Sequence, residues 1–280
     1  MLDRADRVAA SEPAAEEVSG VAAKAQIDRP AAATQLPHAA EDATAAEADV
    51  DPSAAPPAAF PTHYVYAPSR DPNGIGKFFL GREIAHFMTY HGAGWLERPE
   101  RQQTEQPDRL LDAMQISPGA TVADIGAGSG YFSLRLARRV GPEGRVLAVD
   151  IQKEMLALLA QNQKNAGLDN IVGILGTASD PKLPAREVDL VLMVDAYHEF
   201  AYPMEMLRHI RRSLKRDGRV VFVEYRKEDP SINIKLLHKM TEAQVRREAE
   251  AMGLQWLETL DFLPTQHVVI FAPCDARAGI

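Results

Sequence analysis

The chain has 280 residues, one cysteine (Cys274) and a formal net charge of −8. This length suits one large domain or two small ones, and the acidic balance disfavours a protein that binds nucleic acid. A single cysteine provides no disulfide framework, no thiol pair for redox chemistry and no Cys/His cluster, so we expect no metal site.

Residues 1–60 differ in composition from the rest of the chain. They hold 21 alanines and 11 acidic against 4 basic residues, with Phe60 as the one aromatic residue and no apolar periodicity. Such a segment buries too little surface to offset the entropy lost on ordering, so we expect a disordered, Ala/Pro-rich acidic tail. Because this tail carries most of the negative charge, residues 61–280 are close to neutral.

Membrane and export signals are the next features to consider. No apolar run approaches the length that spans a bilayer, and the N-terminus lacks the apolar core of a secretory signal. We therefore expect a cytoplasmic protein without a membrane span, exported only if its true start lies upstream of Met1.

Residues 61–117 precede the first expected strand of the core. Apolar residues between Ile84 and His91 fall at helical spacing and predict a helix over residues 81–90. A second helix is expected over residues 107–114. The whole segment is therefore predicted to be a helical extension.

Residues 121–133 combine a strand, a glycine turn and the start of a helix. Thr121 to Ile125 form an apolar run with one acid, which is typical of a buried parallel strand. Three alternating glycines follow, namely Gly126, Gly128 and Gly130. Tyr131 then opens an amphipathic helix. This order of elements places backbone N–H groups against a nucleotide-like ligand.

A second buried strand, over residues 145–150, ends in Asp150. At about twenty residues beyond the glycines, an acid can accept hydrogen bonds from both ribose hydroxyls of a nucleoside. The same placement serves NAD and S-adenosylmethionine, so Asp150 predicts a nucleoside without choosing the cofactor. Ile151 would add apolar surface beside the adenine.

The choice between the two cofactors depends on Asp124. The G-x-G-x-G spacing differs from the G-x-G-x-x-G of dinucleotide sites, and a carboxylate there would repel pyrophosphate but attract the positive charges of S-adenosylmethionine. The stretch from Asp124 to Gly130 resembles the first motif of the class I S-adenosylmethionine-dependent methyltransferases. The resemblance implies S-adenosylmethionine as the cofactor, bound by Asp124, Gly126, Ala127 and Gly128.

The same resemblance gives an expectation for the segment before the core. Class I methyltransferases carry variable helices there that cover the ligand, so residues 61–117 are expected to form a lid. His91 and Trp95 are candidate lid residues, with packing of the extension as the alternative reading for both.

A third strand is expected over residues 170–175, and the residues after it concern the adenine. Related methyltransferases often place an acid close after this strand, whereas this chain has Thr177 and Ser179 before Asp180. Thr177 and Ser179 are therefore expected cofactor contacts, with Asp180 or a backbone group as alternatives.

A fourth strand is expected over residues 187–194. The stretch 193–200 at its end resembles the fourth motif of small-molecule methyltransferases related to the quinone-biosynthetic group. Asp195 is expected to bind the cofactor. The pKa of a histidine suits proton removal near neutrality, so His198 is predicted to be a catalytic base, unless it is a buried histidine bonded to the backbone. Tyr197 is a second catalytic candidate or a wall of the pocket.

The remaining elements complete the fold. Helices are expected over 203–216 and 241–252, and strands over 219–225, 255–261 and 266–272. The last two strands are too close in sequence for a parallel crossover, so they pair antiparallel. We predict an α/β fold: a three-layer, Rossmann-like sheet of seven strands, mostly parallel with an antiparallel C-terminal hairpin strand, in a catalytic domain over 118–275. Glu224, Tyr225 and Ile232–Met240 would border the substrate.

The predicted function is S-adenosylmethionine-dependent methyl transfer to a small-molecule acceptor. A non-catalytic S-adenosylmethionine-binding sensor or assembly protein is the main alternative, because the strongest motifs all concern the cofactor. An NAD-dependent oxidoreductase is a second alternative, which Asp124, the glycine spacing and the terminal hairpin oppose.

Overall fold

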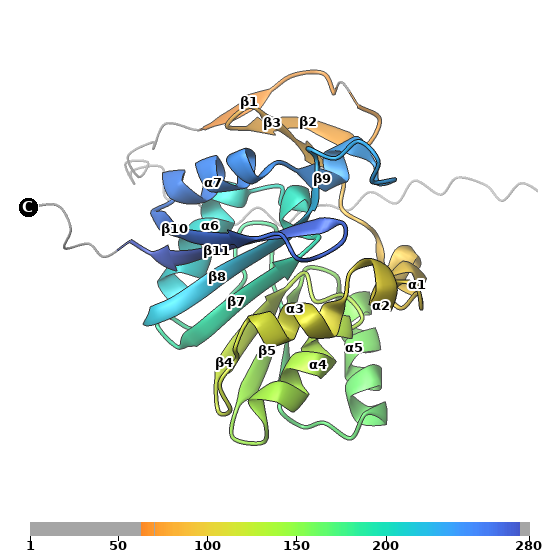
Figure 1. The fold of residues 1–280 in the computed structure, drawn as a ribbon, viewed down its shortest axis with the longest axis vertical. Helices are drawn as coiled ribbons and strands as arrows, with labels where there is room; N and C mark the ends of the chain where they lie inside the picture. Colours follow the sequence, from red (N-terminus) through yellow and green to blue (C-terminus); the bar gives the residue numbers. More distant parts are fainter. Residues whose placement is uncertain (1–62, 70, 275–280) are drawn as a thin grey trace, which may run out of the picture. The chain divides into compact units, whose positions relative to one another are not determined.

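The computed structural model describes residues 63–69 and 71–274 (Figure 1). The predicted acidic tail over residues 1–60 lies outside the described residues. Among the described residues, no helix is both long enough and apolar enough to cross a membrane.

The centre of the fold is a sheet whose strands follow the predicted series. Seven of them form a continuous path in the order β10-β11-β8-β7-β4-β5-β6, and the short strand β9 pairs with β8. Their bounds are β4 Thr121–Ile125, β5 Arg145–Asp150, β6 Ile171–Leu175, β7 Val188–Val194, β8 Leu214–Arg226, β9 Lys239–Met240, β10 Leu254–Leu260 and β11 Gln266–Pro273. The pairs among β4 to β8 are parallel, whereas β11 pairs antiparallel with both β10 and β8. The predicted α/β fold is confirmed.

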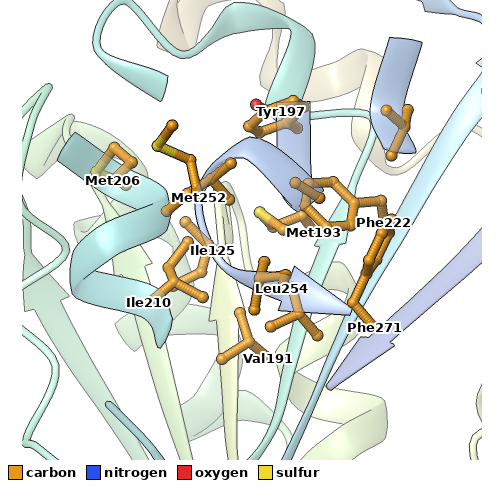
Figure 2. Packing of buried hydrophobic residues seen from close by; sticks show 14 of the residues in the cluster. Ile125, Val191, Met193, Tyr197, Met206, Ile210, Phe222, Met252, Leu254 and Phe271 are labelled. Atoms are coloured by element: carbon orange, nitrogen blue, oxygen red, sulfur yellow. The ribbon is translucent and has the colours of Figure 1, made fainter. Parts of the chain in front are cut away.

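Alternation along the strands divides the core between the two faces of the sheet. One face packs against α6 (Pro203–Ser213) and α7 (Glu242–Ala251), as in the cluster around Phe222 in Figure 2. The other face packs against α3 (Pro107–Ala113), α4 (Tyr131–Val140) and α5 (Lys153–Asn165). Because successive side chains of a strand point to opposite faces, Val221 and Phe222 belong to different layers.

The N-terminal part of the described chain differs from the prediction. The expected helix over residues 81–90 is wrong: a three-stranded antiparallel sheet forms instead, from β1 Tyr64–Tyr66, β2 Gly74–Phe79 and β3 Arg82–Ala85. A two-residue turn joins β2 to β3, with φ of +46° at Leu80 and +94° at Gly81. Positive φ at both positions matches the tight hairpin turns that suit strand twist. All four residues of β3 are buried, which removes the one-sided pattern that a surface helix needs.

Helical structure begins only after this sheet. It consists of the 3-10 turn η1 (Tyr90–Gly92), the single-turn helices α1 (Ala93–Leu96) and α2 (Arg101–Thr104), and then α3. The expected helical extension over residues 61–117 is therefore a small sheet followed by short helices.

Two details of the second half also depend on tertiary contacts. The helix predicted over 203–216 ends at Ser213, because Leu214 is buried and pairs with Val188 of β7 as β8 begins. The predicted N-cap of α7 is confirmed, since the Thr241 hydroxyl accepts a hydrogen bond from the Gln244 N–H at 3.1 Å.

Candidate functional site

A cavity of about 640 Å³ opens at the carboxyl ends of the parallel strands. Loops after β4, β5, β6 and β7 all contribute to its wall, together with residues around η1, α1 and α2 and the segment before β9. Ligands of open α/β sheets bind at this edge, where the strand order reverses. The sequence predicted ligand contacts directly after the strands that form β4, β5 and β7.

The glycine loop after β4 forms one side of the cavity. Gly126 and Gly128 line it, both with positive φ (+77° and +55°). A Cβ atom on Gly126 would lie 2.7 Å from the Cβ of Ala196, and one on Gly128 would lie 2.5 Å from a methyl group of Leu96. The loop therefore needs glycine at both positions. Ala127 is buried behind this wall and does not line the cavity.

Asp150 ends β5 on the cavity wall and holds the glycine loop. Its carboxylate accepts hydrogen bonds from the N–H groups of Gly128 at 2.9 Å and Gln152 at 2.8 Å. Burial raises the pKa of Asp150, and these backbone bonds oppose the shift. Each oxygen has a further lone pair, so both can still accept a hydroxyl donor.

Only some of the residues that were predicted to surround the adenine line the cavity. Ile151, which is 43% exposed, and Thr177 line the cavity. Ser179 does not, and neither does Asp180, whose backbone N–H donates to the Thr177 hydroxyl at 2.9 Å. The predicted contact through Ser179 is therefore not supported by its position.

Asp195 follows β7 and faces the cavity in an uncommon backbone conformation, with φ of +50°. Its Oδ2 accepts a hydrogen bond from Gln266 Nε2 at 2.7 Å, whereas its buried Oδ1 has no partner among the described residues. Burial raises the pKa of Asp195 well above its usual range. An unpaired buried carboxylate oxygen at a cavity wall indicates a ligand that supplies a donor or a positive charge.

A charged cluster lies beside Asp195, and of its four members the sequence predicted only Tyr225 to border the substrate. Glu105 accepts hydrogen bonds from Arg98, from Arg101 Nε at 2.6 Å and from the Tyr225 hydroxyl at 2.9 Å. All four residues line the cavity. For the three residues that were missed, the four-residue spacing of Arg101 and Glu105 is the signal that the sequence offers.

His198 comes from the 3-10 turn η2 (Tyr197–Glu199) and is buried at the cavity wall. Its Nδ1 lies 2.6 Å from Oε2 of Glu224 on β8, and its Nε2 lies 3.1 Å from Nδ1 of His238. Burial alone would lower the pKa of His198, but the Glu224 carboxylate and its hydrogen bond raise it above the ordinary value. Glu224 lies behind His198, off the wall where the sequence placed it.

Tyr197 is in the hydrophobic core rather than at the cavity, which corrects its predicted catalytic role (Figure 2). Its ring meets the edge of Phe222 at 4.9 Å between centroids, and its hydroxyl donates to Glu248 at 2.7 Å. The side chains of Tyr197 and His198 point in different directions from the single turn η2. The sequence of the motif does not show this difference.

Glu199 and His238 extend the polar wall around His198. Oε1 of Glu199 accepts a hydrogen bond from the Met88 N–H at 3.1 Å, and burial raises the pKa of Glu199 to about 7. Burial and the neighbouring His198 lower the pKa of His238 to about 4. Of the two candidate lid residues, Trp95 lines the cavity, whereas His91 is exposed and off the wall.

A family model described as a methyltransferase domain matches residues 116–262, which is more than half of the chain. The chain belongs to the class I S-adenosylmethionine-dependent methyltransferases. It is 33% identical over 112 residues to nocamycin O-methyltransferase of Saccharothrix syringae, covering 40% of each chain. It is 29% identical over 114 residues to demethylmenaquinone methyltransferase of Listeria welshimeri, covering 41% of this chain and 48% of that protein. The matched region thus spans less than half the length of these relatives.

Solved structures agree with the fold of this family. A methyltransferase from Aquifex aeolicus superposes with a TM-score of 0.63 at 23% identity, covering 66% of this chain and 98% of that one. Sheet order and chain topology are therefore those of a class I methyltransferase.

The residues present fit the cofactor of this family, S-adenosylmethionine. Gly126 and Gly128 present backbone rather than side chains to the cavity, Asp150 retains acceptor capacity, and Asp195 Oδ1 lacks a partner among the described residues. These three features line one cavity.

Asp124, which was expected to attract the positive charges of the cofactor, is not on that wall. It is 3% exposed, and its Oδ2 accepts a hydrogen bond from the Ser133 hydroxyl at 2.6 Å. Burial raises the pKa of Asp124 to about 6. The acid of the motif therefore ties β4 to the first turn of α4, and any effect on the ligand acts through the loop.

We expect this raised pKa to make the free energy of unfolding fall as pH rises from about 4 to about 6. In that range the unfolded chain releases the Asp124 proton before the folded chain does, so deprotonation favours unfolding. The effect amounts to about 3 kcal/mol and is constant above this range. Asp124→Asn should remove it, so the stability of the variant relative to the unmodified chain should rise between pH 4 and 7 in denaturant titrations. A difference that does not change with pH would contradict the assignment.

Proposed function

We propose that the chain transfers a methyl group from S-adenosylmethionine to a hydroxyl of a small organic acceptor. The observation that carries this proposal is that one cavity joins the glycine loop and Asp150 to the polar wall of His198, Glu199 and His238. The volume of about 640 Å³ is typical of sites that enclose a small ligand. One relative that matches the chain is named an O-methyltransferase.

The cofactor side of the cavity would be formed by residues after β4, β5, β6 and β7. Asp150 would accept the ribose hydroxyls, and the unpaired Oδ1 of Asp195 would face the ammonium group. Ile151 would pack against the adenine beside Thr177. When bound, S-adenosylmethionine supplies an electrophilic methyl group on a sulfonium centre.

The acceptor side would be the wall around His198. Glu224 orients the imidazole through Nδ1, so that Nε2 points towards His238 and the cavity. These side chains would position the acceptor hydroxyl and favour loss of its proton. Half-exposed Trp95 and partly buried Leu96 also line the cavity, where they would help to exclude water.

His198→Ala should lower the rate of methyl transfer by about 100-fold or more while leaving the affinity for S-adenosylmethionine unchanged. The reason is that His198 belongs to the acceptor wall, whereas the proposed cofactor contacts come from other residues. Most of these are in the loops after β4, β5 and β6, and Asp195 is the one that shares the loop of His198. Methyl-labelled S-adenosylmethionine, incubated with a small-molecule cell extract, would report the rate by mass identification of the labelled product. Calorimetry would report the cofactor affinity.

His209→Ala is the matched control, because His209 is on the surface of α6 away from the cavity and should retain full activity. Equal turnover in His198→Ala and the unmodified chain would remove His198 from the reaction. S-adenosylmethionine binding without any labelled product would instead favour a non-catalytic binding protein.

A further inference from the structure

Three side chains of the acceptor wall bring metal-binding atoms together. Nε2 of His198 lies 3.1 Å from Nδ1 of His238 and 3.9 Å from Oε1 of Glu199, and the last two atoms are 3.5 Å apart. Donors that bind Zn²⁺ tetrahedrally at about 2.0–2.1 Å are separated by about 3.4 Å. The three distances bracket this value, so the three atoms can bind one ion without rearrangement of the backbone.

The hydrogen bonds behind these atoms hold two of them in orientation. Glu224, which is fully buried, lies 2.6 Å from Nδ1 of His198, and this partner assigns the proton to Nδ1 and a lone pair to Nε2. A carboxylate bonded to the far nitrogen of a histidine ligand is a recurring feature of metal sites. The backbone N–H of Met88 fixes Oε1 of Glu199 in the same way.

Chain topology explains how ligands forty residues apart meet. His198 and Glu199 follow β7, whereas His238 ends the 3-10 turn η3 (Leu236–His238) immediately before β9. Strand β9 pairs parallel with the end of β8, which returns this segment to the carboxyl edge of the sheet. Because strand pairing brings His238 to the other two ligands, the spacing of the three residues in the sequence matches no metal-binding motif.

We propose that His198, Glu199 and His238 bind a divalent transition-metal ion of the Zn²⁺ class, with the remaining coordination position open to the cavity. Two imidazoles and one carboxylate suit such ions, whereas Mg²⁺ and Ca²⁺ prefer oxygen ligands. All three residues line the cavity. This proposal deepens the proposed function and rests on it for its substrate: the open position would hold the hydroxyl oxygen of the acceptor.

The consequence for the acceptor is a lower hydroxyl pKa. A divalent cation stabilises the oxyanion of a bound hydroxyl, so the O–H proton passes to water while the oxygen stays on the ion. His198 would then act as a ligand that positions the ion. A metal ion at this site would contradict the expectation, based on the single cysteine, that the chain has no metal site.

The test uses the full chain without a histidine tag, treated with a chelator and titrated with Zn²⁺ alone in a calorimeter. The unmodified chain should bind one equivalent, and His238→Ala and Glu199→Gln should each weaken binding by about tenfold or more. His238 and Glu199 are partly exposed, with 19% and 18% of their side chains accessible, so both variants should fold. His209→Ala should bind as tightly as the unmodified chain. It controls for weak binding by histidines outside the site, because the chain has 8 histidines in all and two of them are the proposed ligands.

Two further measurements separate this proposal from the proposed function. Co²⁺ should give the intense visible absorption of a four- or five-coordinate site, lost in His238→Ala, and S-adenosylmethionine should bind with equal affinity with and without the metal. The metal site would be overturned, even if methyl transfer occurs, by the absence of Zn²⁺ binding or by ligand variants that bind Zn²⁺ as tightly as the unmodified chain. Site-specific metal binding in a chain that transfers no methyl group would reject the proposed function and leave the site standing.

Discussion

Arg82→Ala should lower the free energy of unfolding by about 3–5 kcal/mol, because it leaves a buried carboxylate without its counter-charge. Arg82 on β3 donates from Nε and Nη2 to the two carboxylate oxygens of Glu248 on α7, at 2.7 and 2.8 Å. The exposed fractions of the two side chains are 5% and 0%. Its Nη1 donates to the backbone carbonyl of His198 at 3.0 Å, so the same side chain braces the acceptor wall.

Urea titration would measure this loss of stability. Lys215→Ala is the matched control: Lys215 pairs with Asp189 at 2.7 Å, but the two side chains are 46% and 36% accessible, so the change should cost about 0–1 kcal/mol. An Arg82 variant that is no less stable than this control would show that the ion pair does not hold the N-terminal sheet to α7. Retention of stability in Arg82→Lys would show that charge alone, and not the two-pronged geometry, is sufficient.

Asp150→Ala should weaken S-adenosylmethionine binding by about 100-fold, which is the loss expected from hydrogen bonds to a charged acceptor. The carboxylate would contact the ribose, and it also holds the N–H of Gly128 at 2.9 Å. Its removal therefore affects both a direct contact and the shape of the glycine loop. Isothermal titration with S-adenosylmethionine measures the affinity.

Asp180→Ala is the matched control for Asp150, because Asp180 follows the neighbouring strand β6 without lining the cavity. Its affinity for the cofactor should equal that of the unmodified chain. Asp150→Asn should give an intermediate loss, since an amide keeps one acceptor oxygen but not the charge. Wild-type affinity in Asp150→Ala would contradict the proposed ribose contact.

The sequence predicted the structure best where a local sequence pattern also marks part of the candidate site. The stretch from β4 to α4 forms the predicted strand, glycine turn and helix, and Asp150 lies beside the glycines as its spacing indicated. The short link between β10 and β11 left antiparallel pairing as the one option, and the structure has it. These features follow from periodicity, from glycine conformation and from connection length, all of which are local properties of the chain.

Local patterns failed where burial on two sides or long-range pairing decides the structure. Ile84 has helical spacing with its neighbours, yet it lies in β3 because the Leu80–Gly81 turn folds the chain back and both faces are covered. Tyr197 and His198 are adjacent in one motif, but the tyrosine packs in the core and the histidine faces the cavity. The direction in which each side chain of a single turn points is set by the elements that pack around the turn.

The sheet, the place of the cavity and the class of cofactor were predictable from the sequence, because strand periodicity, glycine spacing and connection length are local properties of the chain. Asp124 pointed to the right cofactor although it is off the cavity wall. Which side chains surround His198 depends on tertiary structure alone. His198 meets His238 only because β9 adds to β8, and Glu224 orients His198 only because β7 and β8 are neighbours in the sheet. Contacts between residues 26 and 40 positions apart depend on strand order, and no periodicity in the chain records them.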